Sequence, residues 1–132
     1  MTRAAGRQTL APAQEPSEAQ ILRDVLVAVS AIPGVVVWRQ NSGLYYTPDG
    51  RGGWRRVRAA IPGAADITGL IRGDHWDGHR SGRRLEIECK TRAGRQSEDQ
   101  RAFQRMVEAH GGLYVLARSA EEAVTAVMGA MG

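Results

Sequence analysis

Three segments of the chain begin with the same local pattern, a serine followed three residues later by glutamine or glutamate. In this pattern, known as a capping box, the two side chains satisfy backbone amides that the first turn of a helix leaves without partners. Apolar residues at helical spacing follow each of the three serines, which are Ser17, Ser97 and Ser119. The sequence therefore predicts helices over about residues 18–31, 98–110 and 120–128.

The middle helix places Phe103, Met106 and Val107 inward by their spacing. It should end at Gly111-Gly112, because glycine tolerates the left-handed conformation that commonly closes a helix. His110, directly before these glycines, is in a position to interact with the last carbonyls of the helix.

Stretches rich in β-branched or apolar residues separate the predicted helices. Val35–Trp38 is apolar on both faces, which is typical of a covered central strand, and Leu113–Leu116 has the same character. Residues 65–71 and 83–90 flank a polar connection over 73–82 and predict a long hairpin.

A second hairpin is predicted from Tyr45-Tyr46 and Trp54–Val57, with Pro48-Asp49-Gly50 between them. The order helix, three or four strands, helix, strand, helix then indicates an α/β protein. We expect a mixed central β-sheet flanked by helices, with a core order of α-β-β-β-α-β-α.

The chain of 132 residues has the size of one domain. We expect residues 1–16, rich in Ala, Gln, Arg and Pro, to form a mobile leader, and residues 17–132 to form the folded domain. The leader lacks the apolar centre of a signal peptide, and no run of 18 apolar residues could span a membrane. A single cysteine, Cys89, excludes an intramolecular disulfide and favours a reducing cytoplasm.

The charge of the chain favours an anionic partner such as nucleic acid, since the net charge is +4 and the isoelectric point about 10.0. Of the 18 basic residues, all but Lys90 are arginine. A GC-rich coding bias is the simplest explanation of this skew. The retained lysine also indicates a position where a guanidinium cannot replace an ammonium group.

Lys90 ends a strand in which charged and apolar residues alternate. Leu85, Ile87 and Cys89 should point into the core, so Glu86, Glu88 and Lys90 share the opposite surface. For the glutamate and lysine alone, an exposed strand with an ion pair is the ordinary explanation.

Asp66 strengthens the hypothesis that this strand carries a functional site. It lies at the start of an apolar strand, after Pro62-Gly63, where a turn or cap residue is also common. If the strands of Asp66 and Glu88 are hairpin neighbours, their carboxylates converge at one end of the sheet. Such hard oxygen ligands suit Mg²⁺ or Mn²⁺ and a phosphate substrate, and Lys90 could stabilise developing negative charge.

Two helix residues join this set. Glu18 shares the inward face of the first helix with Ile21 and Val25 and needs a partner, either a cation with its water or simply the helix dipole. Gln100 shares the inward stripe of the second helix, where capping and a contact with the site are both reasonable roles.

Other polar residues are candidates for binding DNA phosphates, with turns and solvated charge as the alternatives. They follow the first strand, adjoin Trp54 or follow Lys90, and they are Asn41, Ser42, Arg55, Arg56, Arg58, Arg92 and Arg95. His75 and His79 lack the cysteine partners and helical register of a zinc site, so a metal role for them is disfavoured.

Asp66 followed by Glu88-Cys89-Lys90 resembles the PD-(D/E)xK nuclease pattern, with Gly63–Asp66 in place of the usual Pro-Asp. More closely, the chain resembles the VRR-NUC domain from about Ser17 to its C-terminus. The motifs that carry this resemblance, in order, are Glu18–Ile21, Trp38–Gly43, Gly63–Ile67, Ile87–Lys90, Ser97–Gln100 and Gly111–Val115.

The resemblance implies a restriction-endonuclease-like core and a Mg²⁺- or Mn²⁺-dependent endonuclease acting on DNA. It implies that Glu18, Asp66 and Glu88 associate with the metal, that the Cys89 carbonyl is a further ligand, that Lys90 is catalytic and that Gln100 belongs to the site.

By the same analogy we expect a phage or bacterial homodimer, cytoplasmic in the bacterial host, acting on duplex or branched DNA such as Holliday junctions. Two alternatives remain open. One is a DNA-binding module of nuclease fold with little activity. The other is a nuclease that depends on a partner such as a helicase.

Overall fold

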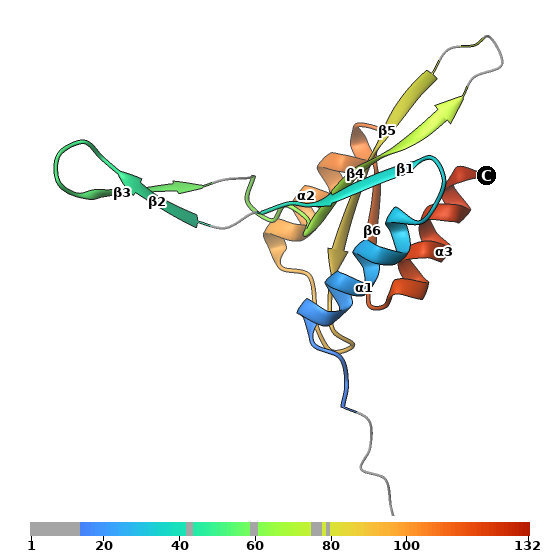
Figure 1. Ribbon diagram of the computed structural model, residues 1–132, viewed down its shortest axis with the longest axis horizontal. Helices are drawn as coiled ribbons and strands as arrows, with labels where there is room; N and C mark the ends of the chain where they lie inside the picture. The colour runs from blue at the N-terminus through green and yellow to red at the C-terminus, as the bar shows by residue number, and fades with distance from the viewer. Residues whose placement is uncertain (1–13, 42–43, 59–60, 75–77, 79) are drawn as a thin grey trace, which may run out of the picture.

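The computed structural model describes residues 14–41, 44–58, 61–74, 78 and 80–132. Over these residues the chain folds as a mixed α/β protein with three helices, labelled in Figure 1. In chain order the elements are α1 Glu18–Ser30, β1 Val35–Arg39, β2 Leu44–Pro48, β3 Trp54–Arg58, β4 Ile67–Asp74, β5 Arg80–Cys89, α2 Glu98–Ala109, β6 Leu113–Ala117 and α3 Ala120–Met131.

The central sheet has the order β1-β4-β5-β6. Strands β4 and β5 form the predicted long hairpin, paired antiparallel with Ile67 opposite Ile87. Strand β6 lies parallel to β5 because α2 carries the chain back across the sheet between them. The sheet is therefore mixed, as expected, and its strands and the three helices follow the order α-β-β-β-α-β-α. The additional pair, β2 and β3, forms a separate sheet, so five strands precede α2 rather than three or four.

The prediction that Val35–Trp38 is a covered central strand was wrong. Strand β1 lies at the edge of the sheet and pairs with β4, and the side chains of Val36 and Trp38 are 62% and 48% exposed. None of the described helices covers this part of the sheet, so β1, which is apolar on both faces, has one face open to solvent. Strand β6 also lies at an edge, although its Tyr114 and Val115 are buried from opposite faces.

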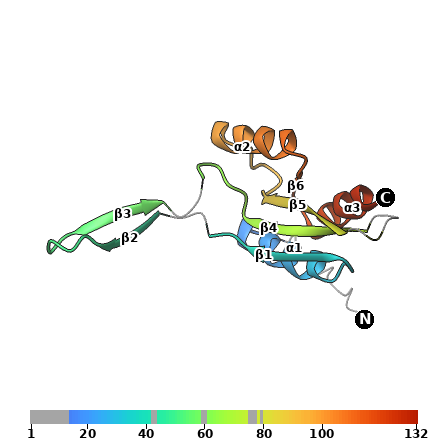
Figure 2. The same ribbon diagram turned by 90° about the horizontal axis from the view of Figure 1, so that it is seen from above.

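Helices lie on both faces of the sheet, with α1 and α3 on one side and α2 on the other (Figure 2). The larger core cluster joins α1 and α3 to residues such as Ile67 and Ile87, and a smaller cluster joins α2 to Tyr114 and the turn before β4. Glu86 and Glu88 point toward the α2 side and are only 1% and 2% exposed. An exposed strand, the ordinary explanation considered for the glutamate and lysine, therefore does not describe these two residues, because α2 covers this half of the face.

The serine caps of all three helices are present, but only α2 has a complete capping box. In α1 the Gln20 side chain bonds Arg23 and Asp24 instead, and in α3 the Glu122 carboxylate accepts from the Arg118 amide. The local pattern thus predicted the first residue of each helix correctly. It did not predict which partner the side chain of the third helical residue bonds.

The end of α2 agrees with its sequence. Gly111 has a φ of +85°, and His110 Nδ1 lies 2.7 Å from the Met106 carbonyl oxygen. Met106 was predicted to face inward and is 38% exposed, so that prediction was wrong. Helix α2 buries Phe103 and Val107 against Tyr114 and the turn before β4, so its inward stripe is narrower than the spacing indicated.

The second predicted hairpin is present as an antiparallel ribbon of β2 and β3, in which Leu44 pairs with Arg58 and Pro48 with Trp54. Figures 1 and 2 show this ribbon projecting away from the central sheet. Most of the expected leader lies outside the described residues, and its last residues, 14–16, form neither helix nor strand. Within the described part of the chain, every helix is too short or too polar to cross a bilayer.

Candidate metal centre

Three carboxylates meet at one end of the sheet. Glu18 is the first residue of α1, Asp66 directly precedes β4, and Glu88 is the second-last residue of β5. Each offers an oxygen atom within 4.8 Å of those of the other two. The structure thus brings together the three acids that the sequence suggested, from segments separated by up to 70 residues.

Asp66 is held in place by the backbone around it. Its Oδ2 accepts a hydrogen bond from the Cys89 amide at 2.8 Å, and its carbonyl oxygen accepts from the Gln40 amide at 2.8 Å. One carboxylate oxygen of Asp66 is therefore hydrogen-bonded to the end of β5, next to Glu88. These bonds hold Asp66 close to Glu88 without any ligand.

The turn that delivers Asp66 depends on Gly63. This glycine has a φ of +77°, and a Cβ atom there would lie 2.3 Å from the backbone carbonyl of Asp99. The turn therefore packs directly against the first turn of α2, an approach and a backbone conformation that a larger residue cannot adopt. Gly63 thereby couples the position of Asp66 to the helix that carries Gln100.

Glu88 is the buried member of the cluster. Its Oε1 accepts a hydrogen bond from Gln100 Nε2 at 2.9 Å and lies 3.6 Å from Lys90 Nζ. Its Oε2 is buried and has no hydrogen-bond donor among the described residues. Burial, and then the nearby charge of Asp66, raise the pKa of Glu88 to about 8, although Lys90 opposes this shift.

Gln100 has both of the roles considered from the sequence. Its Oε1 accepts from the Ser97 amide, completing the capping box, while its Nε2 donates to Glu88. The start of α2 therefore also orients a carboxylate of the cluster. Lys90 has a side chain that is 13% exposed, so its ammonium group is shielded and close to the acids.

The donor set fits a small divalent cation. Carboxylate oxygens are the ligands that Mg²⁺ and Mn²⁺ prefer, and three of them converge here. The buried Oε2 of Glu88 lacks a protein partner, and one ammonium group does not balance the three acids once Glu88 has lost its proton. A cation would supply the missing charge and the missing contact.

Cys89 does not take part through its thiol. The side chain is fully buried on the α1 side of the sheet, and burial raises its pKa to about 12. It is a core residue, as expected, rather than a nucleophile. The role of its carbonyl oxygen as a metal ligand stays a prediction.

Two residues near the site were missed from the sequence. Glu86 is buried beside Glu88 on the same strand, where its Oε1 accepts from Thr68 Oγ1 at 2.8 Å and from Arg84 Nε at 2.6 Å. The sequence carried a signal for it, the alternation that also selected Glu88, but gave no indication that α2 covers this face.

Arg118 is the other missed residue. Its Nη1 donates to the carbonyl oxygens of Thr91 and Gly94 at 2.6 and 2.7 Å and thereby holds the loop that follows Lys90. The contact depends on the parallel pairing of Cys89 with Ala117, and no local pattern in the sequence indicates it.

The candidate DNA-binding residues that the structure describes have no recorded contact with the three clustered acids. Asn41, Arg55, Arg56, Arg92 and Arg95 are exposed, and Arg92 lies 3.6 Å from the Glu15 carboxylate. Ser42, His75, His79 and the side chain of Arg58 lie outside the described residues.

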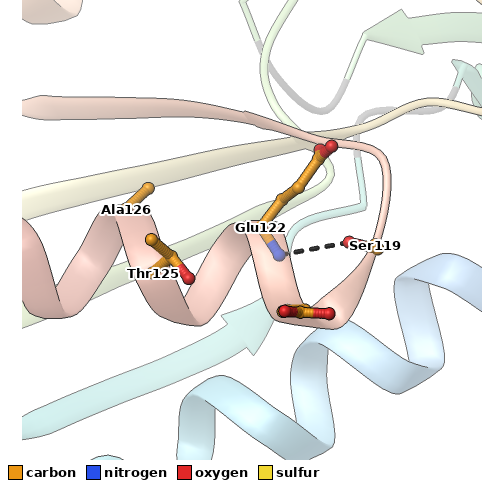
Figure 3. A pocket seen from close by; sticks show the side chains of 5 residues that line it. Ser119, Glu122, Thr125 and Ala126 are labelled. Carbon is orange, nitrogen blue, oxygen red and sulfur yellow. Dashed lines mark hydrogen bonds between the residues drawn. The ribbon is translucent and has the colours of Figure 1, made fainter.

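A separate hollow of about 440 Å³ lies at the start of α3 (Figure 3). It is lined by Ser119, Glu121, Glu122, Thr125 and Ala126, and none of the three clustered acids contributes to it. The Ser119 hydroxyl accepts from the Glu122 amide and caps the helix there. The hollow is therefore explained by the start of the helix and does not indicate a functional site.

Comparison of the chain with models of protein families, with characterised proteins and with solved structures finds no significant match.

Proposed function

We propose that the protein is a divalent-metal-dependent endonuclease that hydrolyses phosphodiester bonds in DNA. The observation that carries the proposal is the convergence of Glu18, Asp66 and Glu88 beside one shielded ammonium group, with a buried oxygen of Glu88 lacking a donor. A buried carboxylate without full compensation is costly, so the presence of Glu88 beside an exposed Glu18 and a partly buried Asp66 favours a functional site.

In this proposal the three acids would hold Mg²⁺ or Mn²⁺. Such an ion, when bound, lowers the pKa of water and offsets negative charge on a phosphate. The residues of the chain prepare the site: the Cys89 amide fixes Asp66, and Gln100 fixes Oε1 of Glu88. Lys90 places a positive charge where an attacking water or the developing charge on phosphorus needs it.

The topology supports a more specific proposal, a restriction-endonuclease-like fold and membership of the VRR-NUC family. An antiparallel hairpin carries Asp66 and Glu88, and α2 then crosses to a parallel strand. By the same resemblance we propose a homodimer whose two sites cut both strands of branched DNA, in a bacterial cytoplasm. The buried, unpaired thiol of Cys89 is compatible with a reducing compartment.

The direct test is cleavage of labelled duplex, flap, single-stranded and four-way DNA with Mg²⁺ or Mn²⁺. We expect Lys90→Ala to lower the cleavage rate about 100-fold or more, as loss of a transition-state contact does. Arg105→Ala removes an equal charge from an exposed position on α2 and should change the rate little.

A second measurement separates this proposal from its alternatives. Mg²⁺ should raise the melting temperature of the wild type but not of Asp66→Asn. Tight DNA binding without cleavage would instead favour a binding module, and cleavage only after adding host or phage extract would favour a partner-dependent enzyme. Absence of both metal stabilisation and cleavage would refute the proposal.

A further inference from the structure

The β2–β3 ribbon has a composition that its own folding does not explain. Figures 1 and 2 show it standing clear of the helices and of the central sheet. A two-stranded ribbon gains little stability by itself, and apolar side chains on it have no core to enter. Yet Trp54 and Tyr46 lie on it with exposed fractions of 71% and 66%.

The strand register gathers these aromatic residues on one face. Tyr46 lies opposite Arg56, and Trp54 precedes Arg56 by two residues on the same strand. Because alternate residues of a strand share a face, all three belong to a single surface, here called the aromatic face. Thr47 lies opposite Arg55 on the other face, which therefore also carries an arginine but neither Trp54 nor Tyr46.

The charge of the ribbon selects the kind of partner. Residues 44–58 contain four arginines, one aspartate and no other charged residue. A segment this basic is repelled by a second copy of a chain with net charge +4, whereas it is attracted to a polyanion. Charge complementarity thus favours nucleic acid over self-association.

The aromatic face narrows the choice of nucleic acid further. Exposed aromatic rings bind bases by stacking, and an arginine beside them adds contacts to a base plane or a phosphate. In a continuous duplex the faces of each base are covered by its neighbours. Stacking on Tyr46 and Trp54 therefore requires bases that are unpaired, as in a single strand, a flap or an open branch point.

The tip of the ribbon is organised before any partner binds. The Asp49 carboxylate accepts from the amides of Arg51 and Gly53 at 2.7 and 3.0 Å, and the Asp49 amide donates to the Gly53 carbonyl. These bonds close the turn and hold β2 and β3 in register without help from a core. The aromatic face is consequently preformed, which lowers the ordering cost of binding.

We propose that the β2–β3 ribbon is an arm that binds unpaired DNA bases by stacking on Tyr46 and Trp54, with Arg56 as a neighbour of both. The inference rests on the proposed nuclease function only in one respect, that DNA with unpaired bases is then the substrate that the acidic cluster cuts. Binding by the arm can be measured without cleavage.

The test is the affinity of the full chain for a labelled 20-nucleotide oligo(dT) and for a 20-base-pair duplex, measured by fluorescence anisotropy in EDTA. Tyr46→Ala and Trp54→Ala should each weaken binding of the single strand about 5-fold or more, in line with loss of one stacked base. Duplex binding should change less than about 2-fold, since stacking is not available there.

Arg55→Ala is the matched control for Arg56→Ala, because the two variants lose the same charge from neighbouring residues on opposite faces. We expect Arg56→Ala to weaken single-strand binding several-fold more than Arg55→Ala. Equal losses would mean that the ribbon contacts DNA through charge alone, which would overturn the proposal.

A second readout uses the intrinsic fluorescence of Trp54 in a Trp38→Phe, Trp76→Phe background. Oligo(dT) should quench this emission, and an equal concentration of duplex should not. Absence of quenching at saturating oligo(dT) would overturn the proposal, as would a change in oligomeric state of Trp54→Ala in light scattering without a change in DNA affinity.

The two proposals fail in different ways. If the aromatic variants lose single-strand affinity but the wild type cuts no DNA with Mg²⁺ or Mn²⁺, the DNA-binding arm is supported and the nuclease proposal is refuted. If the wild type cuts DNA, and Tyr46→Ala and Trp54→Ala bind and cut a flap as well as the wild type does, the DNA-binding arm is refuted and the nuclease proposal is supported.

Discussion

Replacing Glu88 by glutamine should make the metal-free protein more stable at alkaline pH. The pKa of Glu88 is raised from 4.5 to about 8 by burial and by the charge of Asp66. In the folded protein this carboxyl therefore keeps its proton across a pH range in which the unfolded chain has lost it. Unfolding then releases a proton, so the wild type loses stability as the pH rises from about 4.5 toward 8.

The size of the effect follows from the shift. Each pKa unit corresponds to about 1.36 kcal/mol, and between pH 5 and pH 8 the linkage amounts to on the order of 3 kcal/mol. Glutamine cannot ionise, keeps nearly the same shape and can still accept from Gln100. The free energy of unfolding of the wild type, relative to Glu88→Gln, should therefore fall by that amount over the interval.

The assay is urea unfolding of both proteins in EDTA at several pH values from 5 to 8, with thermal melts expected to differ by on the order of 10 °C. Glu121→Gln makes the same chemical change at an exposed site on α3 and controls for the general effect of charge. Saturating Mg²⁺ at pH 8 should raise the free energy of unfolding of the wild type but not that of Glu88→Gln, because a ligand stabilises only the state that binds it. A difference between the proteins that stays constant from pH 5 to 8 would refute the reasoning.

Further predictions concern the backbone around the site. Gly63→Ala should destabilise the protein by about 3 kcal/mol or more, since its φ of +77° and a methyl group 2.3 Å from Asp99 are both unfavourable. Gly129→Ala, a change in open space on α3, should instead stabilise it by up to about 1 kcal/mol, and urea unfolding of both variants checks the contrast. Arg118→Ala should release the carbonyls of the loop after Lys90 and lower cleavage about 10-fold or more with an unchanged fold; unaltered cleavage with normal circular dichroism would show that the loop needs no such support.

Local patterns in the sequence predicted where the three helices begin and which stretches form the long hairpin, although β4, β5 and α3 end at other residues than predicted. The three serine caps predicted the starts of α1, α2 and α3, because an N-cap bond joins residues only three positions apart. The β4–β5 hairpin followed from two strand-like stretches with a polar connection, and this pairing in turn brought Asp66 and Glu88 together. Such features depend on short-range geometry that a sequence contains directly.

Only the tertiary structure decided which surfaces are covered. Alternation showed that Glu86 and Glu88 share a face, but the packing of α2 against that face makes them buried, and the limited reach of the same helix leaves Val36 and Trp38 open at β1.

The second role of Gln100 and the carbonyl contacts of Arg118 likewise arise between segments far apart in the chain. Alternation and helical periodicity specify the direction of a side chain relative to its own element. What that side chain meets, and hence its burial, its pKa and its partners, depends on the other elements that pack there. For that reason the sequence indicated the acidic residues, whereas the fold determined the electrostatic environment in which they lie.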